Sequence, residues 1–537
     1  MKKILLNSML TATLSACIGW SNVANAQSLF KDLVPGANQG SQPKDFITVS
    51  GTMYFITVIN GSSSYSHRLW KSDGTPGGTV VVKDSIINTN VGDVMKMFDV
   101  NGTLFYTLAK NGSATSATLF EIWKSDGTTA GTVRIDSLTC SAGGTPQNWI
   151  VAGDKLFFSK GSVANPFDRE LWVCDGTPGS TQMVVDLNPG TIGGLSNQPM
   201  GAYNGKVYFQ GSESSNFGAP INFELYSSDG TVAGTTLVKD INPGTSSSEP
   251  GSWVLYNSEL YFNANNGSGT KGLWKTDGTT VGTMEVLANA NDFNPKVVFN
   301  NFLYATNGIN LWKSDGTTVG TVFVMDSANV INGATSSYLF TQYMKSLAVA
   351  PYFEMLYKKT DGTTSSTISY DHGNSASYVL LNDKMYQRGQ NYPVAGISGL
   401  WVNDGTEVGT SLLFNAPYMG LPYVFNGTIF FSNFSSAEGY ELWSYTPVST
   451  GLSAIQNSQP EVTIYPNPSN GHFQLNISNI PSVKTTVEIY STTGEKVYGG
   501  TIIKQQSEID ISNLSNGIYF ARINDQTKVY STKIIVQ

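Results

Sequence analysis

The sequence contains few of the residues that enzymes most often use for catalysis. Three histidines and three cysteines are present among 537 residues, and charged residues make up only 13% of the chain. Because a catalytic site needs several titratable groups that converge on one point, we favour a protein without enzymatic activity over an enzyme. After the N-terminal region, no segment approaches the roughly 20 apolar residues of a membrane-spanning helix, so we expect no transmembrane segment.

Positive charge is also scarce. The chain has 31 lysines and arginines against 39 acidic residues, with a net charge of -8 and a pI near 5.0. Nucleic acid would require a basic surface, and this balance excludes it as a partner. Hydrophobic residues (40%) and aromatic residues (12%) are abundant instead. The chain is therefore too apolar for disorder and too long for one small core.

The N-terminus has the pattern of a secretory signal peptide. Two lysines follow Met1, a mostly apolar run comes next, and Ala24-Asn25-Ala26 forms a small-x-small cleavage site. This predicts that residues 1–26 are removed on export. An alternative cleavage site lies inside this segment. Leu14-Ser15-Ala16-Cys17 resembles the bacterial lipoprotein box, in which Cys17 would become the first residue and carry the lipid.

Cleavage after Ala26 would leave two cysteines, Cys140 and Cys174. In an oxidising compartment these could form a disulfide, or each could serve as a small buried apolar side chain. Neither has the spacing partners of a metal site. We expect no metal and no cofactor.

A sequence of the type Leu-Trp-Lys-Ser-Asp-Gly-Thr-x-x-Gly-Thr recurs along the chain at intervals of 38 to 54 residues. Such a period with strand-like content is typical of propellers and related arrays. Each unit contains an apolar strand, a variable loop, a strand with Leu-Trp or Leu-Tyr, the Asp-Gly-Thr turn and a β-branched strand. The turn aspartates are Asp73, Asp126, Asp175, Asp229, Asp277, Asp315, Asp361 and Asp404.

Adjacent apolar residues in these strands indicate sheets that are covered on both faces. Neighbouring side chains in a strand point to opposite sides, so Leu311 and Trp312 cannot enter the same core. Sheets packed face to face around an axis satisfy this pattern. In the turn, aspartate and threonine are expected to bind loop amides, and Gly316 and Gly320 are expected to supply positive φ.

The two ends of the repeat region complement each other. The last unit stops at Tyr440–Pro447, where a final strand should follow, and Leu29–Gly36 resembles the final strands of two internal units. We therefore predict an all-β protein with a large propeller of about nine blades over residues 27–446, closed by an N-terminal strand. The repeat resembles the hyalin-like repeats of secreted bacterial proteins, and this resemblance implies a propeller but no reaction.

The C-terminal part lacks the repeat and differs from it in composition and pattern. Residues 447–460 are polar and turn-rich, which predicts a linker, and residues 461–537 alternate short strands with turns, which predicts a small Ig-like β-sandwich. This segment resembles the type A C-terminal sorting domain of the type IX secretion system of Bacteroidota. The resemblance implies contact with the secretion machinery, passage across the outer membrane, and release or attachment to lipopolysaccharide. Its motif positions are Tyr465, Pro466, Asn467, Pro468, Gly471, Gly494, Gly517, Tyr519 and Lys533.

No catalytic set stands out in the repeats. The histidines outside the tail, His67 and His372, are isolated, and no phosphate loop, zinc spacing or nucleophile elbow is present. Four glutamates precede the Leu/Ile-Trp/Tyr pair and recur with the repeat, which favours a structural role. They are Glu121, Glu170, Glu224 and Glu441.

The variable loops between second and third strands should emerge on one side of the ring. They carry Tyr65, Phe167 and Phe217 among serine, asparagine and glycine, a composition that suits sugars or extended peptides. We therefore predict an exported cell-surface or extracellular adhesion or binding protein for a glycan or protein ligand. The alternatives are a polysaccharide-processing hydrolase with carboxylates at the propeller channel, and a structural surface-layer component.

Overall fold

The computed structural model contains strands and no helix in the part of the chain that it describes. The described residues are 27–35, 40–60, 65–84, 88–89, 96–110, 118–141, 143–190, 192–213, 221–288, 292–328, 330–346, 353–363, 368–371, 377–390, 398–404, 409–447, 462–477, 485–492, 494–502, 504, 506–524 and 529–537. Over these ranges there is accordingly no helix that could cross a membrane. The chain divides into two compact units, Met1–Val448 and Ser449–Gln537.

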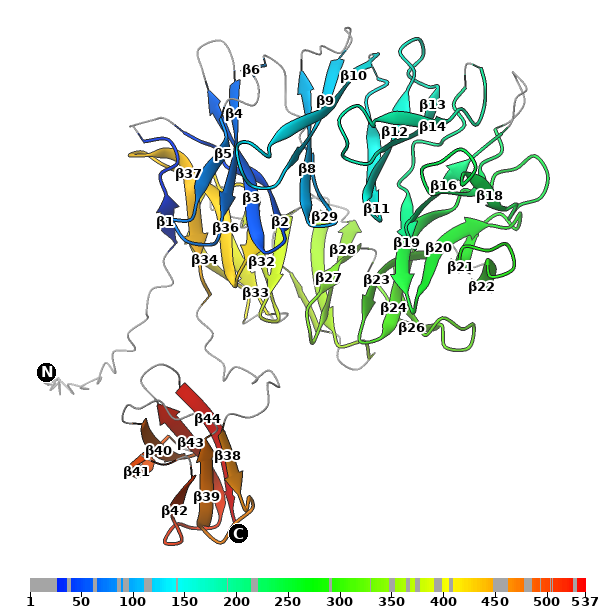
Figure 1. Cartoon of the computed structure of the whole chain (residues 1–537). Coiled ribbons are helices and arrows are strands. Elements are labelled where there is room, and N and C mark those ends of the chain that lie inside the picture. Colours follow the sequence, from blue (N-terminus) through cyan, green and yellow to red (C-terminus); the bar gives the residue numbers. More distant parts are fainter. Residues whose placement is uncertain are drawn as a thin grey trace, which may run out of the picture. The chain divides into compact units, whose positions relative to one another are not determined.

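The first unit consists of nine antiparallel sheets over its described residues (Figure 1). Eight are built from strands that are consecutive in the chain, and the ninth combines the last three strands with the first. From first to fourth strand, the first three sheets are β2 (Lys44–Val49), β3 (Thr52–Asn60), β4 (Tyr65–Ser72) and β5 (Val80–Lys83), with β6 (Asn88–Thr89) beside β4; β7 (Lys96–Val100), β8 (Thr103–Lys110), β9 (Thr118–Ser125) and β10 (Val133–Cys140); and β11 (Gln147–Ala152), β12 (Lys155–Gly161), β13 (Arg169–Cys174) and β14 (Gln182–Val185). The next three, in the same strand order, are β15 (Gly201–Tyr203), β16 (Lys206–Gly211), β17 (Glu224–Ser228) and β18 (Thr236–Lys239); β19 (Gly251–Tyr256), β20 (Glu259–Asn265), β21 (Lys271–Thr276) and β22 (Met284–Leu287); and β23 (Asn294–Phe299), β24 (Phe302–Asn307), β25 (Asn310–Ser314) and β26 (Val322–Met325). The last three are β27 (Val330–Ala334), β28 (Leu339–Ser346), β29 (Phe353–Thr360) and β30 (Ile368–Asp371); β31 (Ser377–Leu381), β32 (Lys384–Gln390), β33 (Ser398–Asn403) and β34 (Ser411–Asn415); and β35 (Tyr423–Phe425), β36 (Thr428–Ser435), β37 (Gly439–Tyr445) and β1 (Ser28–Lys31).

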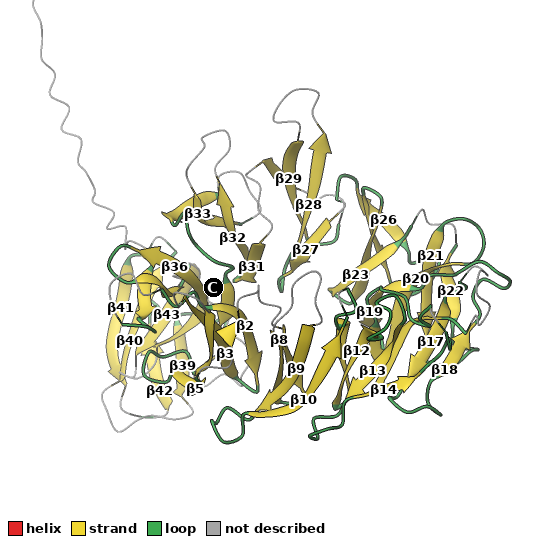
Figure 2. Cartoon of the chain, turned by 90° about the horizontal axis from the view of Figure 1, so that it is seen from above, coloured by secondary structure: helices red, strands yellow, loops and turns green. Residues whose placement is uncertain are grey.

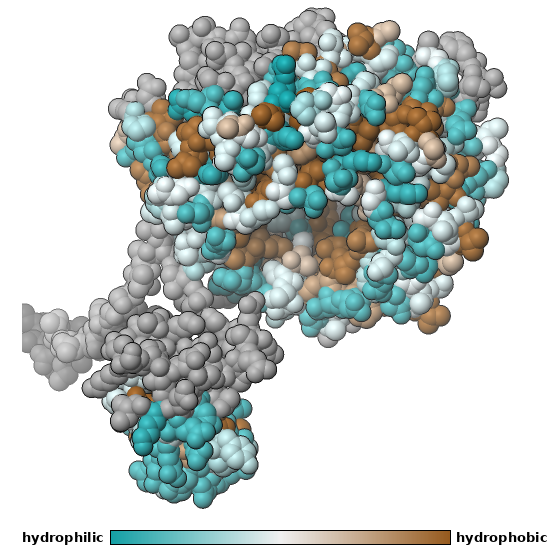
Figure 3. Space-filling view, in the orientation of Figure 1, coloured by the Kyte–Doolittle hydropathy of each residue, from teal (hydrophilic) through white to brown (hydrophobic). Residues whose placement is uncertain are grey.

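The first strands of successive sheets contact one another from β2 through β35, in chain order. The last sheet meets the first where the Phe46 and Tyr423 rings stack at 5.6 Å and the Thr48 and Tyr423 hydroxyls lie 2.8 Å apart. The sheets are thus arranged like the blades of a propeller around a central axis (Figure 2). Figure 3 shows a hollow in the middle of this unit, bordered by hydrophilic and hydrophobic residues.

The hydrophobic core lies between neighbouring sheets. One cluster combines Ile56 and Leu69 of the first sheet with Leu104 and Leu108 of the second. Another joins Phe55 of the first sheet to Phe430 of the last. Because each sheet is covered on both faces, apolar doublets such as Leu-Trp are buried on either side.

The antiparallel order gives the ring two different faces. The loops between second and third strands and the linkers between sheets lie at one end of the strands, and we call this the loop face. The Asp-Gly-Thr turns between third and fourth strands lie at the other end, which we call the turn face. The variable loops therefore share a face with the linkers that lead into the first strands.

The Asp-Gly-Thr turn is held together by its own side chains. Asp73 Oδ1 accepts hydrogen bonds from the backbone and hydroxyl of Thr75, both at 2.8 Å, and Thr75 Oγ1 accepts from Gly78 N at 2.9 Å. The hydroxyls of Ser72 and Thr79 meet at 2.7 Å across its base. These bonds satisfy backbone groups that no strand pairs with, so the turn residues are structural.

The two glycines of the turn differ from the expectation that both adopt positive φ. Gly316 does, at 92°, and a Cβ added there would lie 2.4 Å from the Tyr261 hydroxyl of the preceding sheet. Gly320 has no positive φ; a Cβ at this position would lie 2.0 Å from Asp315 Oδ1. The second glycine is thus required by space for the aspartate and not by backbone conformation.

The N-terminal strand takes the place of a fourth strand in the last sheet. β1 pairs antiparallel with β37, and Leu33 N donates to Glu441 Oε2 at 2.7 Å. Inside the ring, Ile241 N makes the same bond to Glu224 Oε2, also at 2.7 Å. The join between the two ends of the first unit therefore repeats the geometry of an internal sheet.

The second unit contains two sheets around one core. The first holds β38 (Val462–Tyr465), β39 (His472–Ile477) and β42 (Gln506–Asp510), and the second holds β41 (Lys496–Ile502), β40 (Thr485–Ser491), β43 (Gly517–Asn524) and β44 (Val529–Val536). Alternate side chains of both sheets enter a common cluster that includes Phe473, Ile489 and Ile534. The period of two along β43 accounts for this one-sided burial.

Candidate functional site

Several first strands begin with a bulge at the loop face. The pairings of β2, β11 and β19 with their second strands shift register near the start. Each shift contains one non-glycine residue with positive φ: Asp45 (54°), Asn148 (53°) and Ser252 (55°). Bulges re-aim side chains, and strained backbone of this kind gathers at binding sites.

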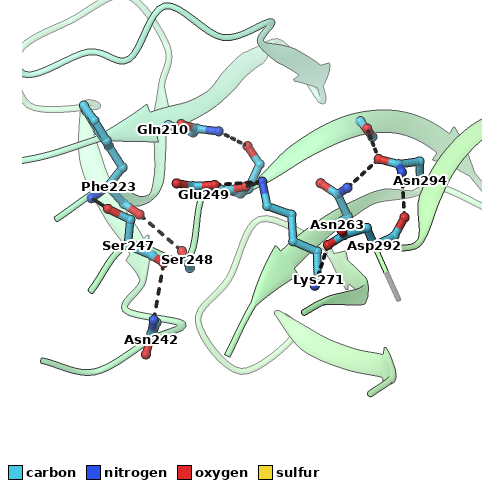
Figure 4. Close-up of polar contacts among 12 residues, drawn as sticks. Gln210, Phe223, Asn242, Ser247, Ser248, Glu249, Asn263, Lys271, Asp292 and Asn294 are labelled. Atoms are coloured by element: carbon cyan, nitrogen blue, oxygen red, sulfur yellow. Dashed lines mark hydrogen bonds and ion pairs between the residues drawn. The ribbon is translucent and has the colours of Figure 1, made fainter. Parts of the chain in front are cut away.

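A pocket of about 810 Å³ opens at this face between three successive sheets, those of β15–β18, β19–β22 and β23–β26. We call it the amide pocket because carboxamide side chains are prominent in its wall (Figure 4). Its volume is in the range of small-molecule sites. The lining residues are Ser196, Gln198, Pro199, Met200, Gln210, Phe223, Glu249, Gly251, Ser252, Trp253, Asn263, Lys271, Asp292, Asn294 and Lys296.

Asn294 is the centre of the polar contacts in this wall. Its Oδ1 accepts from Asn263 Nδ2 at 2.8 Å and from Ser252 Oγ at 3.1 Å, and its Nδ2 donates to the Asp292 carbonyl at 2.6 Å. Because Asn263 and Ser252 come from one sheet and Asn294 from the next, the contacts fix the two sheets against each other. They also fix the orientation of the amide groups (Figure 4).

Lys271 contributes a charge at the first position of β21. Its Nζ lies 3.1 Å from Glu249 Oε2 and donates to the Glu249 carbonyl at 2.9 Å, while its backbone N donates to Asp292 Oδ1 at 3.2 Å. The Lys271 side chain is 27% exposed and that of Glu249 57% exposed. The pair therefore lies at the solvent side of the pocket, where a polar ligand can reach it.

Trp253 forms an aromatic part of the wall and is held in place. Its Nε1 donates to the Pro199 carbonyl at 2.9 Å, and its ring lies 5.2 Å from the Phe262 ring. A Cβ added to Gly201 would approach the indole to 2.7 Å, so this glycine permits the close contact between sheets. The Trp253 side chain is half-buried and fixed.

Of the three aromatic residues predicted for ligand loops, Phe167 does not line the amide pocket. Phe167 lies on the loop after β12 and is 81% exposed. Tyr65 is the first residue of β4, and Phe217 lies outside the described residues. The predicted ligand residues are on the variable loops, whereas linkers between sheets contribute to the lining of the amide pocket. A usable signal was present, because Ser248–Trp253 repeats the Ser-x-Pro-x-x-aromatic pattern of Ser41–Phe46.

The recurring glutamates are buried and bind backbone. Glu170 accepts from Leu187 N at 3.1 Å and from Gly194 N, and burial raises its pKa to about 7. Burial likewise raises the pKa of Glu441 to about 7. Glu121 differs, since it accepts from the Trp123 indole at 3.0 Å. These contacts support the structural role predicted for the recurring glutamates.

The turn aspartates are likewise bound by their own turns. Hydrogen bonds from the threonine two residues on lower the pKa of Asp126, Asp229, Asp277 and Asp315, as they do at Asp73. In Asp175 and Asp361 the carboxylate Oδ1 accepts a hydrogen bond from the backbone N of the threonine two residues on, at 2.8 Å in each turn. Asp404 ends the described part of its strand-to-turn segment.

Of the two alternatives for the cysteines, the structure shows two separate buried side chains and no disulfide. Cys140 and Cys174 are free thiols, fully buried in one hydrophobic cluster, and burial raises the pKa of both. They end β10 and β13, in different sheets, where Cys140 Sγ contacts the Leu138 carbonyl and Cys174 Sγ the Ser180 hydroxyl. Each cysteine fills core space as a small apolar side chain.

Among the motif residues of the tail, Asn467 makes hydrogen bonds to the last strand. Asn467 Nδ2 donates to the Lys533 carbonyl at 2.7 Å, and its Oδ1 accepts from Ile535 N at 2.8 Å. Gly471 has a φ of 92°, and a Cβ there would lie 2.5 Å from Ser512 Cα. Tyr519 donates to the Ser515 carbonyl at 2.7 Å, whereas Tyr465 is 75% exposed. Peptide bonds Tyr465-Pro466 and Asn467-Pro468 are cis, Gly494 has positive φ, and Gly517 begins β43.

Residues 463–537 match the family model of the secretion system C-terminal sorting domain. The tail is a sorting domain of the type IX secretion system. This domain directs the protein across the outer membrane to the cell surface or the extracellular space, which confirms the predicted localisation. The secretion machinery is therefore one partner of the chain.

No curated protein matches the chain. Among solved structures, the β-propeller domain of the Trilobed protease from Pyrococcus furiosus is 9% identical, covers 55% of this chain and all of its own, and has a TM-score of 0.26. An acylaminoacyl peptidase from Pyrococcus horikoshii is 10% identical over 59% of this chain, with a TM-score of 0.30, and this chain spans 58% of its length. A prolyl endopeptidase structure is 12% identical over 82% of this chain and 54% of its own, with a TM-score of 0.36. These likenesses assign no activity.

Proposed function

We propose that the mature protein is a non-enzymatic glycan-binding protein of the cell surface or extracellular space, which captures a neutral oligosaccharide in the amide pocket. The single observation that carries this is the fixed array of Asn263, Asn294 and Ser252 beside the half-buried Trp253. Amide groups supply donors and acceptors in fixed directions, and an indole edge supplies apolar surface. Sugars present both kinds of group, so the pocket fits them better than it fits an apolar ligand.

We further propose that the repeat region, residues 27–446, forms a nine-bladed propeller of the hyalin-like repeat type, closed by β1. Residues 1–26 are a signal peptide, residues 447–460 a linker, and residues 461–537 an Ig-like sorting domain. The tail is removed after export, with release of the protein or its attachment to lipopolysaccharide. Adhesion of a Bacteroidota cell to polysaccharide follows from a propeller held at the surface.

The test uses a pair of lysines on one strand. Lys271 and Lys275 both lie on β21 and both form an ion pair, with Glu249 at 3.1 Å and Glu259 at 2.9 Å. Only Lys271 lines the amide pocket. Titration calorimetry of the full chain with cello-, xylo- and manno-hexaose should detect one ligand, and Lys271→Met should weaken its binding at least about tenfold. Lys275→Met should leave the affinity unchanged, and equal effects of both variants would overturn the proposal.

One observation favours a hydrolase as the second candidate. Glu249 and Asp292 both line the amide pocket and both contact Lys271, so two carboxylates stand at one ligand site. Paired carboxylates are the machinery of glycoside hydrolysis. Incubation with the same hexaoses and analysis of reducing ends distinguishes the two functions. Hydrolysis that Glu249→Gln abolishes would establish the hydrolase, and binding without product would establish the binding protein.

A further inference from the structure

A second pocket lies on the loop face, at the join between the last and first sheets. It has a volume of about 670 Å³ and combines residues of β31–β34, the last sheet and the linker before β2. We call it the seam pocket. Its walls come from chain positions 42–46 and 417–440, which are separated by the whole ring. A ligand bound here would touch both ends of the propeller.

The wall contributed by the last sheet is aromatic. Tyr418 is 56% exposed, and its ring lies edge-on to those of Phe434 at 5.5 Å and Tyr440 at 6.4 Å. Leu421, also in this wall, is 64% exposed. The Tyr440 carbonyl accepts from Ser41 N at 2.6 Å, which fixes the opposite wall against it. The pocket therefore offers flat apolar surface that is already ordered.

The seam pocket also carries cationic side chains. Lys44 comes from the start of β2 and the exposed Arg388 from β32, and the acidic Asp45 lines the same pocket. Two cations against one carboxylate give the lining of the seam pocket a net positive charge, whereas the chain has a net charge of -8. Arginine binds carboxylates through two parallel hydrogen bonds, and aromatic rings pack on the apolar faces of sugar rings.

We propose that the seam pocket binds an acidic glycan through its uronic acid residues, and that its occupation stabilises the closed ring. The carboxylate of the sugar is bound by Arg388 and Lys44, and the pyranose ring packs on Tyr418. The site uses other residues than the amide pocket and does not depend on its ligand. Because a ligand that binds only the closed state shifts the equilibrium toward it, binding and closure are linked.

The first test uses ligands that differ only in charge. The full-length protein is titrated with octagalacturonate and with its fully methyl-esterified form. Binding of the acid that is at least tenfold tighter than that of the ester supports the proposal, and equal binding overturns it. Arg388→Gln and Tyr418→Ala should each weaken binding of the acid at least tenfold. Lys275→Met, a lysine that lines neither pocket, is the control and should leave it unchanged.

The second test addresses closure. Backbone hydrogen exchange is measured with and without octagalacturonate, and residues 28–31 and 41–49 should exchange at least threefold more slowly in its presence. These segments lie at the seam, and residues 236–239 of an internal fourth strand serve as the reference. Protection of the reference alone, or no protection, would overturn the link between binding and closure. The affinity difference between acid and ester would still decide the ligand.

Discussion

The two adjacent glycines Gly77 and Gly78 separate the roles of glycine in the repeat turn. A Cβ added to Gly78 would lie 2.1 Å from Asp73 Oδ1, whereas a Cβ on Gly77 would meet no atom within 4 Å, and neither residue has positive φ. Gly78 is thus needed because the aspartate occupies the space beside it. Gly77 is a spacer that other residues could replace.

This difference predicts opposite effects of the same substitution. Gly78→Ala should lower the free energy of unfolding by about 1–3 kcal/mol, because the aspartate must leave its threonine. Gly77→Ala should leave it unchanged or raise it by up to about 1 kcal/mol, because alanine restricts the unfolded chain. Urea unfolding of the two variants measures both. Equal destabilisation would show that the turn requires glycine at both positions for backbone reasons.

Two buried carboxylates should make the free energy of unfolding depend on pH. The folded-state pKa of Glu170 and of Glu441 is raised to about 7 by burial, above the roughly 4.3 of an unfolded glutamate. Between these values the folded protein holds more protons than the unfolded one. The free energy of unfolding should therefore fall as pH rises from about 4.5 to about 7, and level off above that.

Thermal unfolding across this pH range tests the sign. Glu441→Gln removes one of the two titrating groups and should make the fall between pH 4.5 and 7 shallower. Glu249→Gln, whose side chain is 57% exposed, is the control and should leave the slope unchanged. Stability that rises toward pH 7 would contradict the assignment.

At the scale of elements, β1 forms the contacts of an internal fourth strand on both of its sides. Lys31 Nζ donates to the Thr79 carbonyl of the first sheet at 2.6 Å, as Lys239 Nζ donates to the Thr283 carbonyl of the next sheet at 2.7 Å. Its backbone pairs with β37. The strand therefore joins the last sheet and also the turn of the first.

Removal of residues 27–31 should open this join. The loss of several buried backbone hydrogen bonds, each worth about 1 kcal/mol, should lower the unfolding midpoint and expose β37 to proteolysis. A synthetic peptide of residues 27–35 should restore both when added in excess. An unchanged midpoint would mean that β1 does not close the ring.

Repetition explains which features the sequence could predict. The order of four strands in each unit, the fourth-strand sequence that β1 supplies at the N-terminus and the structural role of Glu224 all follow the repeat. The sequence of one unit could therefore be understood by comparison with the others. The polar array of the amide pocket is not specified by one repeat unit: Asn263, Asn294 and Lys271 come from strands of two sheets, and their meeting depends on how the sheets pack. The space requirement at Gly320 likewise follows from the position of Asp315, which a strand pattern does not specify.

At the scale of the whole molecule, the sorting domain decides where the first unit operates. It is a separate compact unit, and its motif residue Asn467 is bonded to the last strand β44 within that unit. The propeller-like unit has its own cores between sheets. The first unit should thus fold without the tail, and passage across the outer membrane should depend on the tail.

Deletion of residues 461–537 tests this division in the native cell. The truncated protein should accumulate in the periplasm with the thermal midpoint of the intact first unit, while the full-length product reaches the medium or the cell surface. Intact-mass analysis of that product should show loss of the tail. A smaller change, Asn467→Ala, breaks the two bonds to β44 and should reduce export without altering the first unit. Export of the truncated protein at the full-length level would show that the first unit carries its own signal.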